Sequence, residues 1–224
     1  MAWTRTRARG FTLVELLVAM AIMAMMAGLA WRALDGMIRA RDQITQRSDE
    51  TLALQAALSQ WGTDLDAVVE TQLVNAVDFD GRALRLTRRD ATDPVAGVRV
   101  VAWTLRAGTQ GGRWLRWQSP AVRTRAELQS AWAQAALWAA NPSNEARRSE
   151  VDIAAADAWQ VFYFREDSWT NPQSSATPRP GTAGGNLVPP PEGVRLVLNL
   201  SAGQALAGPV TRDWVRPNLN AKKS

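Results

Sequence analysis

The chain of 224 residues has no cysteine and no histidine, only one tyrosine, and two lysines, Lys222 and Lys223. Without histidine it cannot build a Ser-His-Asp triad, a Cys-His pair or a His-based zinc site. Without cysteine, any folded domain must hold its core together without disulfides. These absences exclude the enzyme classes that depend on such groups, and we expect no catalytic residue, no metal and no cofactor.

The scarcity of titratable groups also explains a high isoelectric point of about 10.8. Almost nothing titrates between the carboxylates and the arginines, so a net charge of only +5 drives the value upward. Three of the 26 basic residues lie in the first ten positions, which leaves 23 basic against 21 acidic residues in the rest. A remainder so close to neutral lacks the basic footprint of a nucleic-acid binder.

What the chain does contain is a long apolar run behind a short arginine leader. Arg5, Arg7 and Arg9 precede residues 11–31, in which Glu15 is the only ionisable side chain. Twenty-one residues in a helix span about 31 Å, the thickness of the hydrocarbon core of a bilayer. A carboxylate within such a segment is costly unless it meets a cation, so Glu15 is a candidate functional residue.

A cut between Gly10 and Phe11 would supply that cation. The new amino group would lie four residues before Glu15, on the same helix face and at the same depth. The sequence Gly10-Phe11-Thr12-Leu13-Val14-Glu15 resembles the processing site of type IV pilins and type II secretion pseudopilins. The resemblance implies that a prepilin peptidase cuts after Gly10 and methylates Phe11, and that Glu15 guides assembly into a filament.

Two simpler interpretations compete with this one. A secretory signal peptide could be cut near residues 27–30, but a carboxylate within its apolar region is unusual. A plain single-pass anchor explains the length of the run and leaves Glu15 unexplained. The leader arginines favour a cytoplasmic amino terminus, and Arg32, Arg39 and Arg41 beyond the run weaken that preference without cancelling it.

Helical spacing of apolar residues continues beyond the expected span. The apolar positions Leu34, Ile38, Leu54, Leu58, Trp61, Leu65 and Val68 recur mostly at steps of three and four residues. We expect one helix from Phe11 to about Glu70, comprising a leader at 1–10, a transmembrane helix at 11–33 and a periplasmic amphipathic helix at 34–70. Polar residues around Arg41 and Arg47 interrupt the stripe and indicate a stalk. The stripe from Leu54 to Val68 predicts packing under a sheet, with contact to other subunits as the alternative.

From Leu73 onward the pattern favours strands. Residues 78–81 read as a turn, and we expect strands at 82–87, 98–105, 114–117, 159–165, 194–200 and 210–215. Residues 108–112 predict a hairpin, residues 127–140 a second helix that ends at Asn141-Pro142, and residues 170–191 a long loop. The expected fold is therefore α+β: a long helix packed on a mostly antiparallel sheet, with a domain at 71–216 and a tail at 217–224.

The carboxy-terminal third carries a second resemblance. Phe162-Tyr163-Phe164, Trp169, residues 193–198, Gly203 and Arg212 are similar to the J-type minor pseudopilin of type II secretion, as are Trp61, Asp64 and Leu65. This resemblance implies a low-copy subunit at the tip of a periplasmic pseudopilus, anchored in the inner membrane. Its implied partners are the I-, K- and H-type minor pseudopilins, the major pseudopilin and the prepilin peptidase. Glu15 disfavours the K type, which usually lacks that glutamate.

Other candidate sites have plainer explanations. Asp78, Asp80, Asp90 and Asp93 could suggest calcium, but no calcium-loop pattern is present, and we expect solvated turn residues. The adjacent Glu166 and Asp167 are expected at a charged strand end. Most of the eleven tryptophans, namely Trp103, Trp114, Trp117, Trp132, Trp138 and Trp159, are expected in the core or at subunit contacts, and Trp169 and Trp214 near loops or the chain end.

Three functions remain open from the sequence. The first is a J-type minor pseudopilin, and the second is a minor pilin of a type IV pilus, which the same amino-terminal motif supports. The third is a membrane-anchored periplasmic enzyme, which the absence of histidine and cysteine disfavours.

Overall fold

The computed structural model describes residues 11–90, 97–108, 111–174 and 187–217. The chain divides into two compact units, residues 1–48 and 49–224. The first unit consists of the amino-terminal part of helix α1 (Leu13–Asp66), and the second comprises the end of that helix and a domain of strands and two shorter helices.

Helix α1 ends at Asp66, four residues before the expected end near Glu70. The residues that follow leave the helix because they bond to the sheet. The N–H of Val69 donates to the carbonyl of Thr87 at 2.9 Å, and the N–H of Arg89 donates to the carbonyl of Ala67 at 3.0 Å. The apolar residues up to Leu65 are therefore spaced for packing of the helix, whereas Val68, beyond Asp66, belongs to a segment that contacts the sheet like a strand.

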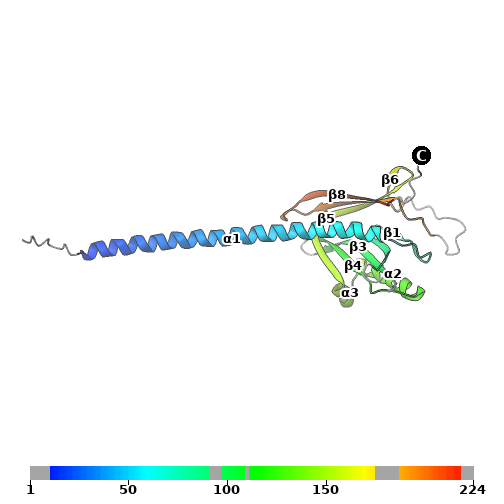
Figure 1. Ribbon diagram of the computed structural model, residues 1–224, viewed down its shortest axis with the longest axis horizontal. Helices are drawn as coiled ribbons and strands as arrows, with labels where there is room; N and C mark the ends of the chain where they lie inside the picture. Colours follow the sequence, from blue (N-terminus) through cyan, green and yellow to red (C-terminus); the bar gives the residue numbers. More distant parts are fainter. Residues whose placement is uncertain (1–10, 91–96, 109–110, 175–186, 218–224) are drawn as a thin grey trace, which may run out of the picture. The chain divides into compact units, whose positions relative to one another are not determined.

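Within the described residues, eight strands form one antiparallel sheet in the order β1-β2-β3-β4-β5-β7-β8, with β6 paired to β5 (Figure 1). Their bounds are β1 Val77–Phe79, β2 Ala83–Arg89, β3 Val98–Gly108, β4 Gly111–Gln118, β5 Glu150–Arg165, β6 Ser168–Thr170, β7 Gly193–Leu200 and β8 Gly208–Val215. Two helices, α2 (Arg125–Ala140) and α3 (Asn144–Arg148), lie between β4 and β5. The α+β class and the long helix followed by an antiparallel sheet are confirmed.

Some elements differ from the expectation. Residues 78 and 79 belong to β1 rather than to a turn, and the connection to β2 consists of Asp80, Gly81 and Arg82, where Gly81 has φ of +90°. Strand β5 begins nine residues before the expected Trp159. Helix α3 and strand β6 were not expected, and Thr170, the expected first residue of the long loop, belongs to β6 together with Trp169. Residues 109–110 of the expected hairpin and 175–186 of the expected loop lie outside the described residues.

Strand β5 belongs to both halves of the sheet. Its residues from Glu150 to Ala155 pair with β4, and its residues from Ala156 to Phe164 pair with β7 on the other side. The register shifts once against β4 and once against β7, and such bulges bend a strand and increase its twist. The bends in β5 accompany the curl of the sheet between its two halves.

The concave side of the sheet packs against the end of α1. The helix contributes Leu54, Ala57, Trp61 and Leu65 at helical steps, which meet alternate residues of the central strands, such as Leu84, Leu86, Val101 and Trp103. Trp61, Trp103 and Trp114 form a cluster with ring centroids 4.8 to 6.3 Å apart. The expected packing of residues 54–65 under a sheet is confirmed.

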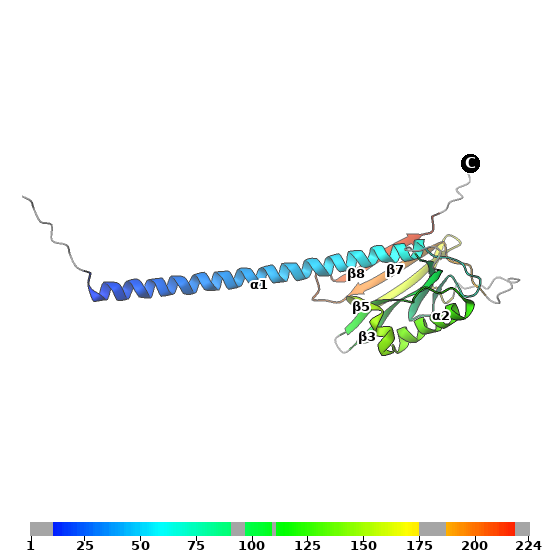
Figure 2. The same cartoon turned by 60° about the horizontal axis from the view of Figure 1, so that its bottom comes forward.

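Helix α2 covers the opposite face of β2, β3 and β4 (Figure 2). Its buried residues Leu128, Ala131, Ala135 and Trp138 recur at three- and four-residue steps. Thr124 caps its start by accepting the N–H of Glu127, while Glu127 accepts the N–H of Thr124. Strand β3 is consequently buried on both faces between two helices.

Candidate functional site

The start of α1 carries a capping box built from two of the motif residues. The Thr12 hydroxyl accepts the N–H of Glu15 at 3.3 Å, and the Glu15 carboxylate accepts both the N–H and the hydroxyl of Thr12 at 3.0 Å. These bonds satisfy N–H groups that have no partner within a helix. They also hold the carboxylate at the first turn of the helix, close to the backbone of Phe11.

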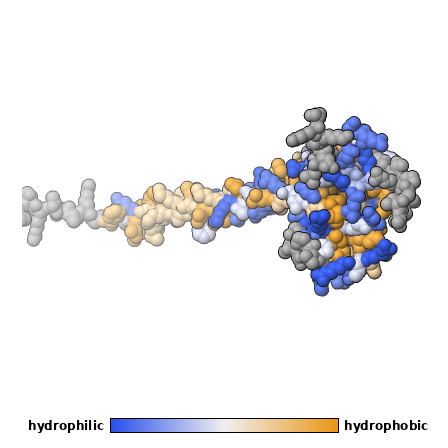
Figure 3. All heavy atoms as spheres, turned by 45° about the vertical axis from the view of Figure 1, so that its right-hand side comes forward, coloured by the Kyte–Doolittle hydropathy of each residue, from blue (hydrophilic) through white to orange (hydrophobic). Residues whose placement is uncertain are grey.

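Phe11 lies just before the helix with its side chain 84% exposed, and Gly10 lies outside the described residues. Helix α1 is long and apolar enough to cross a membrane, with a mean hydropathy of 2.3 over its most apolar 18 residues, none of which is buried by the protein. Figure 3 shows the side chains of this segment as a continuous apolar surface. An exposed apolar helix of this length is suited to lipid or to other apolar helices.

Residues 5–31 match the family model of the prokaryotic N-terminal methylation motif. The match covers the leader arginines, Gly10, Phe11, Glu15 and the apolar run. A comparison with curated proteins finds no match. The motif implies processing by a prepilin peptidase and assembly with pilin-like proteins, and it indicates a structural role rather than catalysis. It supports a type IV pilin-like or pseudopilin protein.

A buried carboxylate, Asp64, joins the end of α1 to the sheet. Its side chain is fully buried and accepts hydrogen bonds from Arg116 of β4 at 2.8 and 2.9 Å. It also accepts from the indole Nε1 of Trp103 on β3 at 3.1 Å and from Arg88 of β2. Three neighbouring strands thus contact one carboxylate, with Gln60 of the same helix as a further donor at 2.8 Å.

A second contact secures the last turn of α1. The indole Nε1 of Trp214 on β8 donates to the carboxylate of Asp66 at 2.7 Å. Trp214 is buried and belongs to the core, from its place in the last strand of the sheet. Asp64 and Asp66 therefore tie the helix to both halves of the sheet.

The aspartates considered for calcium are engaged by arginines. Asp78 and Asp80 both pair with Arg85, and Asp90 pairs with Arg99 at 2.7 Å. Asp90 is buried, so the expectation of a solvated turn residue is wrong for it, because Arg99 compensates its charge. Asp93 lies outside the described residues. No group of three metal-ligating side chains occurs in the described part of the chain.

Glu166 and Asp167 form the tip of the hairpin between β5 and β6. Both have positive φ, 49° and 60°, as in the two-residue hairpin turn of type I′. Arg165 and Ser168 pair on either side of them. The two carboxylates lie at a charged strand end, as expected, rather than in a cleft.

The tryptophans mainly serve the core. Trp103, Trp114, Trp117 and Trp138 are buried, as the spacing predicts, whereas Trp132 and Trp159 are only partly buried. The ring of Trp132 lies beneath the guanidinium of Arg85, 5.1 Å from its centroid, and the ring of Trp159 meets Phe79 edge to face. These contacts account for the two partly buried rings within the domain.

Tyr163, the single tyrosine of the chain, has a buried hydroxyl that makes no hydrogen bond within the described residues. Burial raises the pKa of this phenol far above its ordinary value, with a smaller contribution in the same direction from Asp78. Charging the phenol inside the domain is therefore strongly unfavourable.

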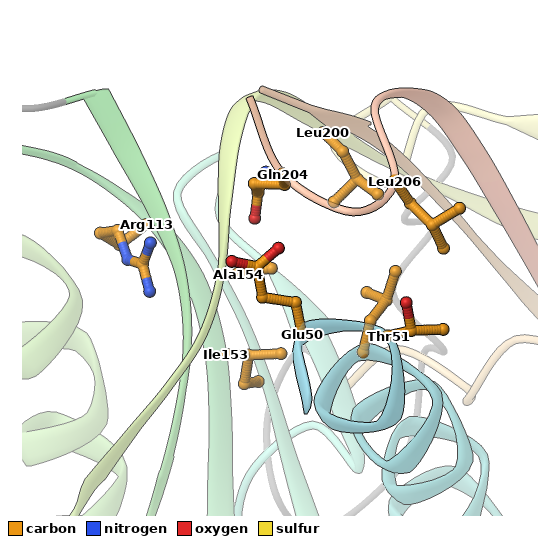
Figure 4. Close-up of a pocket in the computed structure, with 9 residues that line it drawn as sticks. Glu50, Thr51, Arg113, Ile153, Ala154, Leu200, Gln204 and Leu206 are labelled. Atoms are coloured by element: carbon orange, nitrogen blue, oxygen red, sulfur yellow. The ribbon is translucent and has the colours of Figure 1, made fainter. Parts of the chain in front are cut away.

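A small pocket of about 150 Å³ lies between α1, β5 and the connection from β7 to β8 (Figure 4). Its polar groups are already used by the fold. Glu50 accepts the N–H of Ala205 at 2.8 Å, and the amide of Gln204 bonds to both backbone groups of Ala155. Typical ligand pockets enclose about 300 to 1,000 Å³, so this hollow is better explained as a junction of the fold than as a substrate site.

The sequence alone predicted the amino-terminal motif that the family model matches, but not the role of Asp64. Asp64 appeared only as part of a family resemblance, and its partners Arg88 and Arg116 are 24 and 52 residues away. One local signal was present for Thr12: a threonine three residues before a glutamate at the start of an apolar run is the pattern of a capping box.

Proposed function

We propose that the protein is a minor pseudopilin of a type II secretion system, of the J type, which joins the tip of the periplasmic pseudopilus and supports export of folded proteins. The observation that carries the proposal is Glu15, the only ionisable residue of the apolar run, at the fifth position after Gly10 within the matched motif. A plain anchor has no use for this carboxylate.

In this proposal, the leader spans 1–10, the transmembrane helix 11–33, the periplasmic helix 34–70 and the periplasmic domain 71–216, followed by a tail at 217–224. The prepilin peptidase cuts between Gly10 and Phe11 and methylates Phe11. The protein lies in the inner membrane with its amino terminus in the cytoplasm. Its partners are the I-, K- and H-type subunits and the major pseudopilin.

The chemistry of the new amino group supports the role of Glu15. The Glu15 carboxylate already lies at the first turn of α1, where it accepts the N–H of Thr12. An amino group on Phe11 would lie one residue from that N–H and would bring a positive charge to the same depth. The two charges compensate each other in lipid, either within one subunit or between neighbours.

The J-type assignment has separate support in the domain. Trp61, Asp64 and Leu65, which carry part of that resemblance, are all buried at the junction of α1 with the sheet. The carboxy-terminal part of the resemblance falls on β5, β6, β7 and β8, which form one half of the sheet, with Gly203 in the connection between β7 and β8. The amino-terminal motif supports a minor pilin of a type IV pilus equally well, so the test must separate the two.

The first test is the amino terminus of the protein isolated from membranes of its own host. Mass spectrometry is expected to find methyl-phenylalanine at position 11. A protein that still carries the arginine leader, or that begins beyond Ala30, would exclude the proposal. The second test deletes the gene: loss of secreted proteins with intact pili supports the pseudopilin, and loss of pili with intact secretion supports the type IV pilin.

A further inference from the structure

The helix beyond the apolar run has a face that no part of the described chain covers. Its side chains recur at steps of three and four residues, and each of its four large apolar members is at least half exposed. We call this face the stalk seam, and it consists of Leu34, Met37, Ile38, Arg41, Ile44 and Thr45. Arg41 is the one charged residue among them.

Arg41 differs from the other arginines of this segment in its neighbours. Residues three and four positions away on a helix are the ones that can pair with it, and for Arg41 these are Met37, Ile38, Ile44 and Thr45. Across the described ranges, Arg41 takes part in no ion pair. By contrast, Arg39 pairs with Asp35 on the polar side of the helix. An arginine in an apolar seam requires a carboxylate when that seam is covered.

The register of the proposed assembly specifies where this carboxylate must lie. Arg41 is 26 residues beyond Glu15, and an ideal helix places the two about 80° apart around its axis, so one neighbouring parallel helix can contact both. Suppose that the amino group of the neighbouring helix contacts Glu15. The residue of the neighbour that lies at the same height along the axis as Arg41 is then about 26 residues after the neighbour's own first residue.

We propose that the stalk seam docks the helix of a different pilin-like subunit, and that Arg41 pairs with an aspartate or glutamate of that helix roughly 24 to 29 residues after the partner's processed amino terminus. The inference rests on the proposed function and adds the chemistry of the partner. The apolar members of the seam supply contact area, and Arg41 selects a partner of opposite charge and fixes the axial register.

A second copy of this chain satisfies the requirement less well. In a second copy, the residue level with Arg41 is Met37, and the nearest carboxylate is Asp35, about 3 Å lower along the axis. Asp35 is already bonded to Arg39 of its own helix. A partner with an unengaged carboxylate at this level is therefore the better match.

A lipid surface also fits the arrangement less well than a helix does. Helix α1 continues without a break from the apolar run through the stalk seam. Each residue beyond Trp31 therefore lies farther along the helix axis from the apolar run. Headgroup-binding helices carry several cations along the border of the apolar face. The stalk seam has one cation, and on the polar side Arg39 is paired with Asp35 while Asp42 adds a further negative charge.

The test uses the full-length chain, coexpressed with the other pilin-like subunits of its host and recovered from detergent-solubilised membranes. Arg41→Glu is expected to lower the recovery of one partner at least about tenfold. Arg39→Glu is the matched control, with the same charge change two residues away on the polar side, and is expected to retain the partner. Reversing the charge of the partner's carboxylate is expected to restore recovery with Arg41→Glu.

A second measurement uses the absence of cysteine. Arg41→Cys introduces the only thiol of the chain, and it is expected to form a disulfide with a cysteine placed at the partner's carboxylate. Equal recovery with Arg41→Glu and Arg39→Glu overturns the proposal. A labelling result can also overturn it. If Arg41→Cys is protected from a water-soluble maleimide to the same degree with and without the partners, lipid and not a partner helix covers the residue. The proposed function is tested separately from the role of Arg41. If the processed protein begins at Phe11 and Glu15→Ala loses the partner, the proposed function holds whether or not Arg41 pairs with that partner.

Discussion

Asp64 of α1 and Arg116 of β4 form a two-point ion pair, with Nε to Oδ2 at 2.8 Å and Nη2 to Oδ1 at 2.9 Å. The carboxylate is fully buried, and Arg88 and Trp103 complete its hydrogen bonds. Buried ion pairs contribute modestly as a whole, but removing one partner leaves the other charge unpaired in the interior. This asymmetry makes Asp64 the most sensitive polar residue of the helix-sheet junction.

Asp64→Ala is expected to lower the free energy of unfolding by about 3 to 5 kcal/mol, because two arginines lose their counter-ion in the core. Unfolding of the full-length protein in detergent by urea, followed by tryptophan fluorescence, measures the change. Asp152→Ala is the control: its partner Arg113 is 44% exposed, and exposed pairs contribute about 1 kcal/mol or less. Similar losses for the two variants would contradict the central role of Asp64.

Because Tyr163 is buried, we expect the folded domain to lose stability in alkali. Burial raises its pKa in the folded state above the unfolded value near 10, so above about pH 10 only the folded state keeps the proton. Stability that is fully present below this pH then falls by about 1.4 kcal/mol per pH unit as the pH rises. The measurement is urea unfolding from pH 8 to 11.5 on the wild type and on Tyr163→Phe.

The variant Tyr163→Phe is expected to show a shallower fall and to be unchanged or slightly more stable at pH 8, because it removes a buried hydroxyl without a hydrogen-bond partner in the described chain. The chain suits this test because it has no other tyrosine, no cysteine and only two lysines. Parallel curves for the two proteins would show that Tyr163 is not the group that titrates.

Gly10→Ala is expected to block removal of the leader and to leave a precursor ten residues longer than the wild type, which intact mass measurement detects. The reason is that the proposed cut follows Gly10 directly. Gly28→Ala, within α1, is the control, since an added methyl there meets nothing within 4 Å. Normal trimming of Gly10→Ala together with normal trimming of the control would argue against cleavage at this bond.

Glu15→Ala is expected to leave membrane insertion intact and to reduce incorporation into the proposed fibre at least about tenfold, because the amino group that the proposed cut creates on Phe11 would lose its counter-charge in lipid. Copurification with other pilin-like subunits measures the effect. Thr12→Ala separates charge from capping, since it removes the hydroxyl of the capping box and keeps the carboxylate. An equal defect in both variants would assign the effect to the helix start instead of the charge.

The amino-terminal methylation motif could be predicted from the sequence because its signals are local. Gly10, Phe11 and Glu15 fall within six residues, and one apolar run defines their surroundings. The strands with alternating residues and the helix ending at Asn141 were predictable for the same reason. Strand β1 was missed because Asp78 and Phe79 next to Asp80-Gly81 favour a turn locally, whereas pairing with β2 decides the outcome.

The role of Asp64 could not be predicted from its own neighbourhood. Its burial depends on Arg88 and Arg116, which reach it only after three strands have paired. The burial of Asp90 likewise depends on Arg99 across two strands. Charge compensation of this kind is a property of the tertiary structure, which explains why apolar periodicity located the helix face but not the ion pairs within it.

The position of β5 has a consequence for the order in which the domain folds during synthesis. Strand β4 has no partner on its second side until residues 150–155 arrive, and these follow two helices. A chain still missing its last third therefore presents a bare backbone edge beside Trp114 and Trp117, and such edges recruit other chains. A chain whose synthesis stalls after α2 would therefore be an aggregation-prone intermediate, because the second edge of β4 is covered only when the carboxy-terminal part of the domain is made.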